Sequence, residues 1–257
     1  MSALGRVLCV WRRNLDVYMV TWKVNFLPPL LEPMFYLLAF GAGLGGFVKV
    51  VPYGGGEVGY TAFLAPGMVG ISIMFQSFFE CTYGSYIRMY YQKTFDAIIA
   101  TPLSIEEVIT GEILWGGTKA FISVAIMAAV VRAFGLMKFP DLLALPFLAF
   151  VCGLFFAAIG MCYTSIAPSI DSFNYPIFLF ITPMSLFGGT YFPISGLPGW
   201  AQKVAVFMPL THVTEMTRSI AFGRWDAALA VRAGIFVVAA AAAMALAVRL
   251  MRKRLVV

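Results

Sequence analysis

Long apolar runs separated by short polar stretches dominate the sequence, and this pattern predicts an all-α protein that crosses a membrane several times. A helix needs about 17–25 mostly apolar residues to cross the hydrocarbon core of a bilayer. Runs near that length predict six spans, at about residues 25–47, 61–83, 113–131, 142–167, 175–191 and 227–248. Because no long polar segment separates them, we expect residues 1–257 to form a single transmembrane domain.

Residues 1–24, before the first expected span, carry too many charges to cross a membrane. As a helix they would be amphipathic, with Leu4, Val7, Leu8, Trp11 and Leu15 on one face and Arg6, Arg13 and Lys23 opposite. We therefore expect an amphipathic interfacial helix that lies flat on the cytoplasmic membrane surface.

The segment 84–112 separates the second and third expected spans and carries regularly spaced charges. As a helix, it would place Ile87, Tyr91, Phe95 and Ile98 on one face, and Arg88, Gln92 and Asp96 on another. Thr101-Pro102 should end that helix, because the residue before a proline is disfavoured in the helical conformation. Ser104 and Glu107 form an S-x-x-E capping box that can start the next helix. The pattern predicts two helices joined by a sharp elbow, although an ordinary amphipathic loop would have the same pattern.

Residues 192–226, between the fifth and sixth expected spans, are apolar but interrupted by Pro193, Pro198 and Pro209. The pieces between the prolines are too short to cross a membrane. Irregular backbone at membrane depth is tolerated only where protein covers it. We therefore expect short re-entrant helices that enter the membrane from its outer side.

The composition excludes a soluble domain. The 257 residues are 61% hydrophobic and 12% charged, with a mean hydropathy of +0.89, whereas soluble domains are about 25% charged. The basic residues behind the net charge of +6 gather near both ends of the chain, as Arg6, Arg12, Arg13, Lys23, Arg249, Arg252, Lys253 and Arg254. Such clusters are typical of cytoplasmic flanks near anionic membrane lipid, not of a nucleic-acid site. Both termini are therefore expected in the cytoplasm.

Few residues of the sequence are candidates for proton transfer or metal binding. Glu80, Glu112 and Lys119 are ionisable groups at or near membrane depth, where such groups are functional candidates. Glu112 and Lys119 are seven residues apart and share a helical face, so they could neutralise charge between helices; a proton relay is the alternative. His212 is the only histidine, and without a cluster of other ligands it predicts no metal site.

The sequence contains no P-loop, no Gly-x-Ser-x-Gly motif and no pair of carboxylates at catalytic spacing. We therefore expect no catalytic residue and no hydrolytic activity in this chain. Aromatic residues crowd the fifth expected span and its end, among them Phe178, Phe187 and Tyr191. They can pack the helices together, or they can line the pathway of a substrate that contains lipid or sugar.

Several motifs resemble the permease subunits of ABC-2 type exporters, and most closely the branch named for nodulation-factor lipo-oligosaccharide export. The motifs are FLAPG at 63–67, FDAIIATP at 95–102, GE at 111–112, LWG at 114–116, GG at 188–189, FP at 192–193, LP at 197–198, and PLTH at 209–212 followed by Arg218. The likeness extends from about Pro28 to Arg224, which is nearly the whole chain.

The resemblance implies a six-helix subunit of the bacterial inner membrane that works as a homodimer with two copies of a separate ATP-binding cassette ATPase. ATP and Mg²⁺ would bind to that ATPase, and this chain would hold no cofactor. The elbow would be a coupling helix that docks on the ATPase, with the coupling residues Tyr91, Phe95, Asp96, Ile98, Thr101, Pro102, Ser104, Glu107 and Glu112. The outer segment would close the exit of the pathway, with the gate residues Phe192, Pro193, Leu197, Pro198, Pro209 and Arg218.

The function expected from these observations is that of a permease for a lipid-linked glycan, a lipo-oligosaccharide or a similar amphiphile. An exporter of drugs or small hydrophobic compounds is the alternative within the same superfamily. From other classes, an ion-coupled secondary transporter would need a buried acid whose neutralisation abolishes transport. A membrane enzyme would need a polar catalytic cluster that the sequence does not supply.

Overall fold

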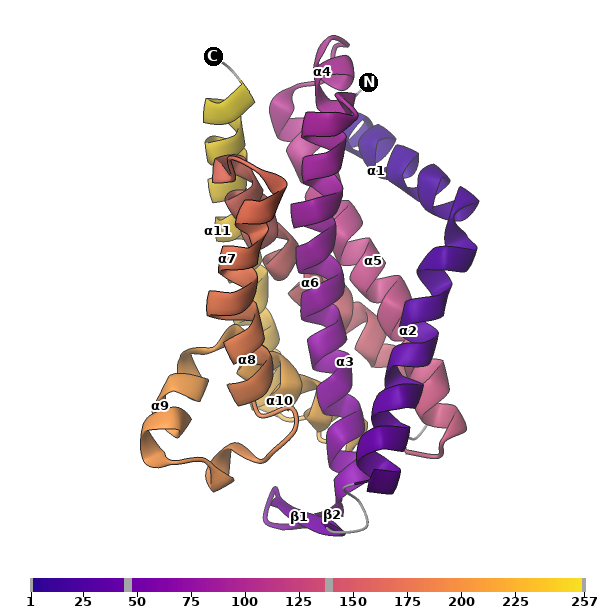
Figure 1. The fold of residues 1–257 in the computed structure, drawn as a ribbon, viewed down its shortest axis with the longest axis vertical. Helices are drawn as coiled ribbons and strands as arrows, with labels where there is room; N and C mark the ends of the chain where they lie inside the picture. The colour runs from indigo at the N-terminus through magenta and orange to yellow at the C-terminus, as the bar shows by residue number, and fades with distance from the viewer. Residues whose placement is uncertain (1, 44–47, 137–140, 256–257) are drawn as a thin grey trace.

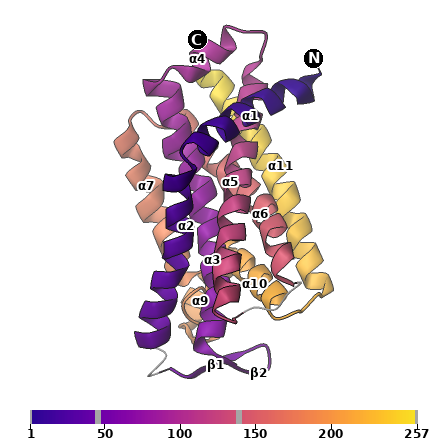
Figure 2. The same cartoon turned by 90° about the vertical axis from the view of Figure 1, so that its right-hand side faces the viewer.

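A computed structural model describes residues 2–43, 48–136 and 141–255 of the chain (Figure 1). Long helices lie side by side in one bundle. The two termini and the short helix α4 lie at one end of the bundle, whereas the strands β1 and β2 and the helix α9 lie at the other (Figures 1 and 2).

The elements before residue 137 are α1 (Ala3–Val20), α2 (Trp22–Tyr36), the π-helical segment η1 (Leu37–Gly43), β1 (Val50–Tyr53), β2 (Gly56–Gly59), α3 (Tyr60–Phe79), the π-helical segments η3 (Glu80–Gly84) and η4 (Ile87–Tyr91), α4 (Thr94–Ile99) and α5 (Ile105–Ala133). The later elements are α6 (Asp141–Ile166), the 3₁₀ turn η5 (Ile170–Phe173), α7 (Asn174–Pro176), the π-helical segment η6 (Ile177–Ile181), α8 (Thr182–Phe187), the 3₁₀ turn η7 (Ile194–Gly196), α9 (Gly199–Phe207), α10 (Pro209–Ala221) and α11 (Ala227–Leu255).

Helix α3 is the centre of the bundle. It contacts α5, α6 and α10, and most of its side chains are buried. Its sequence is apolar on every face, which is the pattern of a helix enclosed by other helices. The remaining elements are therefore arranged around α3.

Small residues allow α5 to approach its neighbours closely. A Cβ atom added at Gly116 would lie 2.8 Å from Cβ of Ala157 on α6 and 3.0 Å from Sγ of Cys81 in η3. A Cβ atom at Gly153 of α6 would lie 2.9 Å from Cβ of Ala120 on α5. Contacts between small residues are a main source of helix association in membranes, where water provides no hydrophobic driving force between helices.

Four helices of the described residues have the length and apolar composition of membrane spans, namely Tyr60–Tyr91, Ile105–Ala133, Leu143–Ile166 and Ala227–Leu255. They correspond to four of the six predicted spans. The other two predicted spans fall on the helical runs 22–43 and 174–187, which are interrupted by prolines and π-helical turns. Residues 44–47, at the end of the first predicted span, lie outside the described residues. The protein is thus an all-α membrane protein, and the number of six spans stays a prediction.

The predicted elbow is present, but it begins later than expected. The helical run that starts at Tyr60 continues through η3 and η4 to Tyr91, so the prediction of a separate interfacial helix from Gly84 is wrong. Lys93, with a left-handed φ of 54°, breaks the helix before α4. The capping box is confirmed: Glu107 N–H donates to Ser104 Oγ, and Ser104 N–H donates to a Glu107 carboxylate oxygen.

A two-stranded hairpin occupies part of the segment between the first and second predicted spans. Strands β1 and β2 pair in antiparallel register, with Tyr53 opposite Gly56. Gly54 and Gly55 both have positive φ, 62° and 82°, as a tight two-residue hairpin turn requires. In the outer segment, the prolines delimit short helices as predicted, since η7, α9 and α10 replace any long helix.

Replacing Gly116 by alanine should lower the thermal stability of the purified protein in detergent. The added methyl group meets Ala157 and Cys81, and overpacking of this kind costs about 1–3 kcal/mol. Gly234 of α11 is the matched control, because no atom lies within 4 Å of a Cβ atom placed there. Gly234→Ala should leave the midpoint of unfolding unchanged or slightly higher, since alanine favours a helix over glycine by about 0.5–1 kcal/mol. Equal midpoints for the two variants would contradict the close contact.

Candidate functional site

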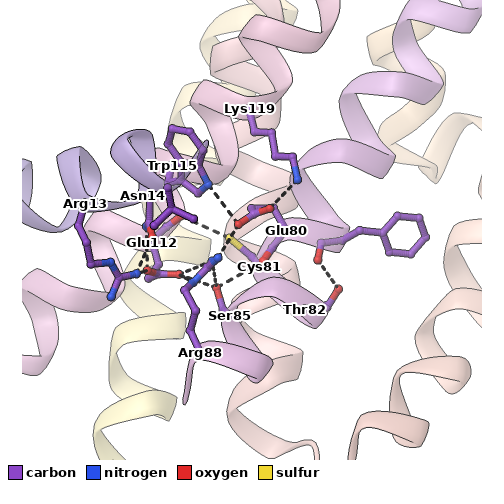
Figure 3. A network of polar contacts seen from close by, with 12 residues as sticks. Arg13, Asn14, Glu80, Cys81, Thr82, Ser85, Arg88, Glu112, Trp115 and Lys119 are labelled. Carbon is purple, nitrogen blue, oxygen red and sulfur yellow. Dashed lines mark hydrogen bonds and ion pairs between the residues drawn. The ribbon is translucent and has the colours of Figure 1, made fainter. Parts of the chain in front are cut away.

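Buried and half-buried charged side chains from α1, η3, η4 and α5 meet in one network (Figure 3). We call this group the ion-pair network, and its charged members are Arg13 of α1, Glu80 of η3, Arg88 of η4, and Glu112 and Lys119 of α5. Three cations therefore face two carboxylates. The network joins the N-terminal helix, the end of the α3 run and α5 at one place.

Glu112 is fully buried and receives hydrogen bonds on both of its carboxylate oxygens. Its Oε1 accepts from Asn14 Nδ2 at 2.9 Å and from Arg13 Nη2 at 3.1 Å. Its Oε2 accepts from Ser85 Oγ at 2.8 Å and from Arg88 Nη2 at 2.6 Å. The carboxylate is thus paired with two cations and two neutral donors, as a buried charge requires.

Glu80 is the second buried carboxylate of the network. It accepts from Lys119 Nζ at 2.7 Å and from Trp115 Nε1 at 3.1 Å, and it pairs with Arg88 Nη1 at 2.8 Å. Arg88 therefore bridges Glu80 and Glu112. Its planar guanidinium can serve two carboxylates at once, which a lysine ammonium at the same place could not do with fixed geometry.

The sequence correctly indicated that Glu112 and Lys119 neutralise charge between helices, but not with which partners. They do not pair with each other: Lys119 pairs with Glu80, and Glu112 pairs with arginines. Arg13 and Arg88 were not predicted as site residues. The available signal was the seven-residue spacing of Arg6 and Arg13, which places both on one face of α1.

Helix α1 is fixed to α5 by polar contacts along its length. Arg6 pairs with Glu107 at 2.6 Å, and Trp11 Nε1 donates to Thr118 Oγ1 at 2.9 Å. The hydrogen bond to Glu107 raises the pKa of Arg6, and burial lowers the pKa of Arg13. Both arginines of the predicted polar face thus pair with carboxylates of α5, and the position of α1 on the membrane surface stays a prediction.

The predicted coupling residues lie in different environments. Tyr91 is 60% exposed, and Asp96, Thr101, Pro102 and Ser104 are exposed as well, whereas Ile98 is half-buried. Glu107 and Glu112 are buried in their ion pairs. Phe95 is fully buried and belongs to the same apolar cluster as Val108 and Ile109 of α5. The prediction that Phe95 is a side chain that docks on a partner is therefore wrong: the ring fixes α4 to α5 instead.

Arg218 connects the outer segment to the rest of the bundle. It is 1% exposed, and its guanidinium donates to the carbonyl oxygens of Gly189 at 2.6 Å, Thr190 at 3.0 Å and Phe63 at 3.3 Å. It also lies 3.7 Å from the centre of the Phe63 ring. The nearest carboxylate, that of Glu215, is 3.8 Å away. Burial lowers the pKa of Arg218 to about 10.

The other predicted gate residues are not gathered around Arg218. Phe192 and Pro198 are exposed, and Pro193, Leu197 and Pro209 are half-buried. His212, whose role the sequence left open, has Nε2 at 2.9 Å from the carbonyl oxygen of Val206. Within the described part of the outer segment, α10 is firmly held, since Leu210, Thr214 and Thr217 are fully buried like Arg218. The part before α10 presents a more open apolar surface, with Phe192, Trp200 and Phe207 exposed.

The three aromatic residues predicted to line a substrate pathway also lie in different environments. Phe178 is 69% exposed, Phe187 contacts Trp200, and Tyr191 contacts Phe40 of η1. The structure contains an apolar groove of about 380 Å³, but none of these three residues is among those that line it. Its walls are almost entirely apolar and come from α3, α6, α7, η6, α8, α10 and α11, with Phe78, Phe155, Phe180, Met184 and Leu250 among the lining residues.

Residues 6–222 match the family model described as ABC-2 type transporter, and the chain therefore belongs to this family. It is a membrane subunit of such a transporter, as the motifs of its sequence indicated. No group of three or more potential metal ligands occurs among the described residues.

Individual relatives agree with the family. The chain is 40% identical to Nodulation protein J of Rhizobium leguminosarum bv. trifolii over 217 residues, which are 84% of this chain and 81% of that protein. It is 38% identical to Nodulation protein J of Rhizobium meliloti strain 1021 over the same share of both chains. It is 18% identical to the inner membrane transport permease YadH of Escherichia coli K12 over 89% of this chain and 88% of that protein.

Glu112→Gln should destabilise the protein, because it removes the charge that Arg13 and Arg88 share while leaving both arginines in place. Hydrogen bonds to charged groups contribute about 1.5–3 kcal/mol each, so we expect a clearly lower midpoint of thermal unfolding in detergent. Asp96→Asn is the control, because Asp96 is exposed and such surface changes stay within about 0.5 kcal/mol. A Glu112→Gln protein as stable as Asp96→Asn would mean that the network contributes nothing to the fold.

Proposed function

We propose that this chain is the permease subunit of an ATP-binding cassette exporter that moves a lipid-linked glycan, a lipo-oligosaccharide or a similar amphiphile outward. Two copies would form the pathway, and two separate ATPase subunits would hold ATP and Mg²⁺. The main support is the 40% identity to Nodulation protein J over most of both chains, within a family of transporter membrane subunits.

The proposed topology has six spans with both termini in the cytoplasm of a bacterial cell, in the inner membrane. The positions of the termini and α4 at one end, and of β1, β2 and α9 at the other, support it (Figures 1 and 2). Arg252, Lys253 and Arg254 in the last turn of α11 lie at the end with the termini. Basic residues at that end favour the cytoplasmic side.

The elbow that contains α4 is proposed to dock on the ATPase. It lies at the tip of the end that we assign to the cytoplasm (Figure 1). Phe95 holds α4 against α5, and the Ser104–Glu107 capping box joins the elbow to α5 with little freedom. Movement of α4 would therefore be passed to α5 and, through Arg6 and Arg88, to α1 and the α3 run.

The apolar groove supports an amphiphilic substrate. Walls made of Phe78, Phe155 and Phe180 can hold an acyl chain without leaving polar groups unpaired. The same groove also favours the second candidate, an exporter of small hydrophobic compounds. An ion-coupled transporter has less support, because Glu80 and Glu112 are each held by fixed cations.

The two candidates can be separated by transport into vesicles. The permease and its ATPase would be reconstituted in proteoliposomes with either a fluorescent lipo-oligosaccharide or a hydrophobic dye of similar size that lacks the glycan. We expect ATP-dependent movement and stimulation of ATP hydrolysis by the lipo-oligosaccharide alone. Equal or better transport of the dye would favour the second candidate, and transport that needs an ion gradient in place of ATP would overturn the proposal.

The topology can be tested with single cysteines at exposed positions in a chain whose native cysteines are replaced by serine. Glu57→Cys in β2 should react with a membrane-impermeant maleimide added to intact spheroplasts. Asp96→Cys in α4 should react only after the membrane is made permeable. Both positions are exposed in the structure. Labelling of the Asp96→Cys protein from outside would reverse the proposed orientation.

Tyr91→Ala should weaken binding of the ATPase by about tenfold or more, because a large side chain buried at a contact contributes about 1.5–3 kcal/mol. The readouts are co-purification with the ATPase and substrate-stimulated ATP hydrolysis. Trp200→Ala is the matched control, since Trp200 is an equally exposed aromatic residue of α9 at the other end of the bundle. If the Tyr91→Ala permease retained the ATPase as well as the Trp200→Ala permease, α4 and its flanks would not be the docking surface.

A further inference from the structure

A cavity of about 350 Å³ lies beside the ion-pair network, between α1, the start of α2, the end of the α3 run and α5. Its polar walls include Arg13, Tyr18, Glu80, Arg88 and Lys119. Its apolar walls include Val17, Ile87 and Trp115. The transport function proposed above makes no use of this cavity.

The charges around the cavity do not balance. Arg13, Arg88 and Lys119 contribute three positive charges, whereas the network holds the two carboxylates Glu80 and Glu112. Arg88 uses all three of its guanidinium nitrogen atoms to contact the two carboxylates and Ser85. The surplus of one positive charge therefore belongs to Arg13 and Lys119, on the cavity wall.

Unused hydrogen-bond donors belong to the same two residues. Nη1 of Arg13 is buried and has no hydrogen-bond partner among the described residues. Lys119 Nζ, which carries three N–H groups, donates one hydrogen bond, to Glu80. A buried donor without an acceptor is costly, so an anion with several acceptor oxygens would stabilise this wall.

The surroundings indicate that the anion is attached to an apolar chain. Thr21 and Asn25 on the cavity wall are flanked along the chain by exposed Val20, Val24 and Leu27. This exposed apolar surface lies where α1 meets α2. A free, fully hydrated anion would gain nothing from it, whereas an amphiphile could place its head group in the cavity and its chains along α2.

We propose that this cavity binds the phosphate group of an anionic membrane lipid, with Arg13 and Lys119 as the phosphate-binding residues. A phosphodiester carries one negative charge and so matches the single surplus positive charge. The bound lipid would complete the wall between α1 and α5 and hold α1 against the bundle. The inference depends on the membrane embedding of the chain, not on the substrate or the partner proposed above.

The test is native mass spectrometry of the delipidated full-length permease, titrated with phosphatidylglycerol or with zwitterionic phosphatidylcholine in the same detergent. We expect one tightly held phosphatidylglycerol per chain and weaker binding of phosphatidylcholine. Arg13→Gln and Lys119→Gln should each weaken the binding of phosphatidylglycerol about tenfold, and Lys119→Arg should restore it. Arg252→Gln removes the same charge at an exposed site of α11 and should bind like the wild type.

The thermal stability of each variant is measured first, so that poor folding is not mistaken for loss of lipid binding. Lys119→Gln and Lys119→Arg alter the same position but differ in charge, so a difference in lipid binding between them reports on the charge. Equal lipid binding by the wild type, Arg13→Gln and Lys119→Gln would overturn the proposal. So would displacement of the lipid by millimolar inorganic phosphate, which would mean that the cavity is a site for free phosphate and not for a lipid.

Discussion

Two buried carboxylates that share one arginine impose the strongest constraint on this protein. A buried carboxylate is costly unless cations and hydrogen-bond donors contact it, and both Glu80 and Glu112 are buried. Arg88 serves both of them, and Arg13 and Lys119 each serve one. Because these groups belong to α1, to the α3 run and to α5, the pairing fixes the relative positions of three elements at one end of the bundle.

The other end is held by a different kind of contact. Arg218 has backbone carbonyl oxygens as its main partners, from the start of α3 and from the turn at Gly189 and Thr190. Burial lowers the pKa of this guanidinium, and the charge of Glu215 opposes the shift. The two ends of the bundle thus differ: several close ion pairs hold one end, whereas at the other a single buried cation bonds to carbonyl oxygens and has a carboxylate, that of Glu215, only at 3.8 Å.

Sequence patterns predicted the helices well where a local signal exists. The Ser104–Glu107 cap, the proline-delimited helices after residue 192 and the long apolar helices all follow from spacing within one segment. The errors concern partners that are distant in the sequence. Arg88 can lie inside a long helical run because Glu80 and Glu112 neutralise it, and Phe95 is buried because α5 covers it. Neither fact can be read from the local pattern of polar and apolar residues.

The π-helical turns η3 and η4 couple the ion-pair network to the register of the helix that carries Glu80 and Arg88. In them the backbone bonds to the fifth residue back, as in the 2.9 Å contact between Gln92 N–H and the carbonyl oxygen of Ile87. If one such turn were to relax to α-helical geometry, the residues beyond it would rotate by about 100° around the helix axis and advance by about 1.5 Å. Relaxation of η3 would carry the Arg88 guanidinium away from Glu112. The ion pairs of Arg88 and the π-helical turns therefore belong to the same register of the helix. A change from π-helical to α-helical geometry in η3 would break those ion pairs at the same time.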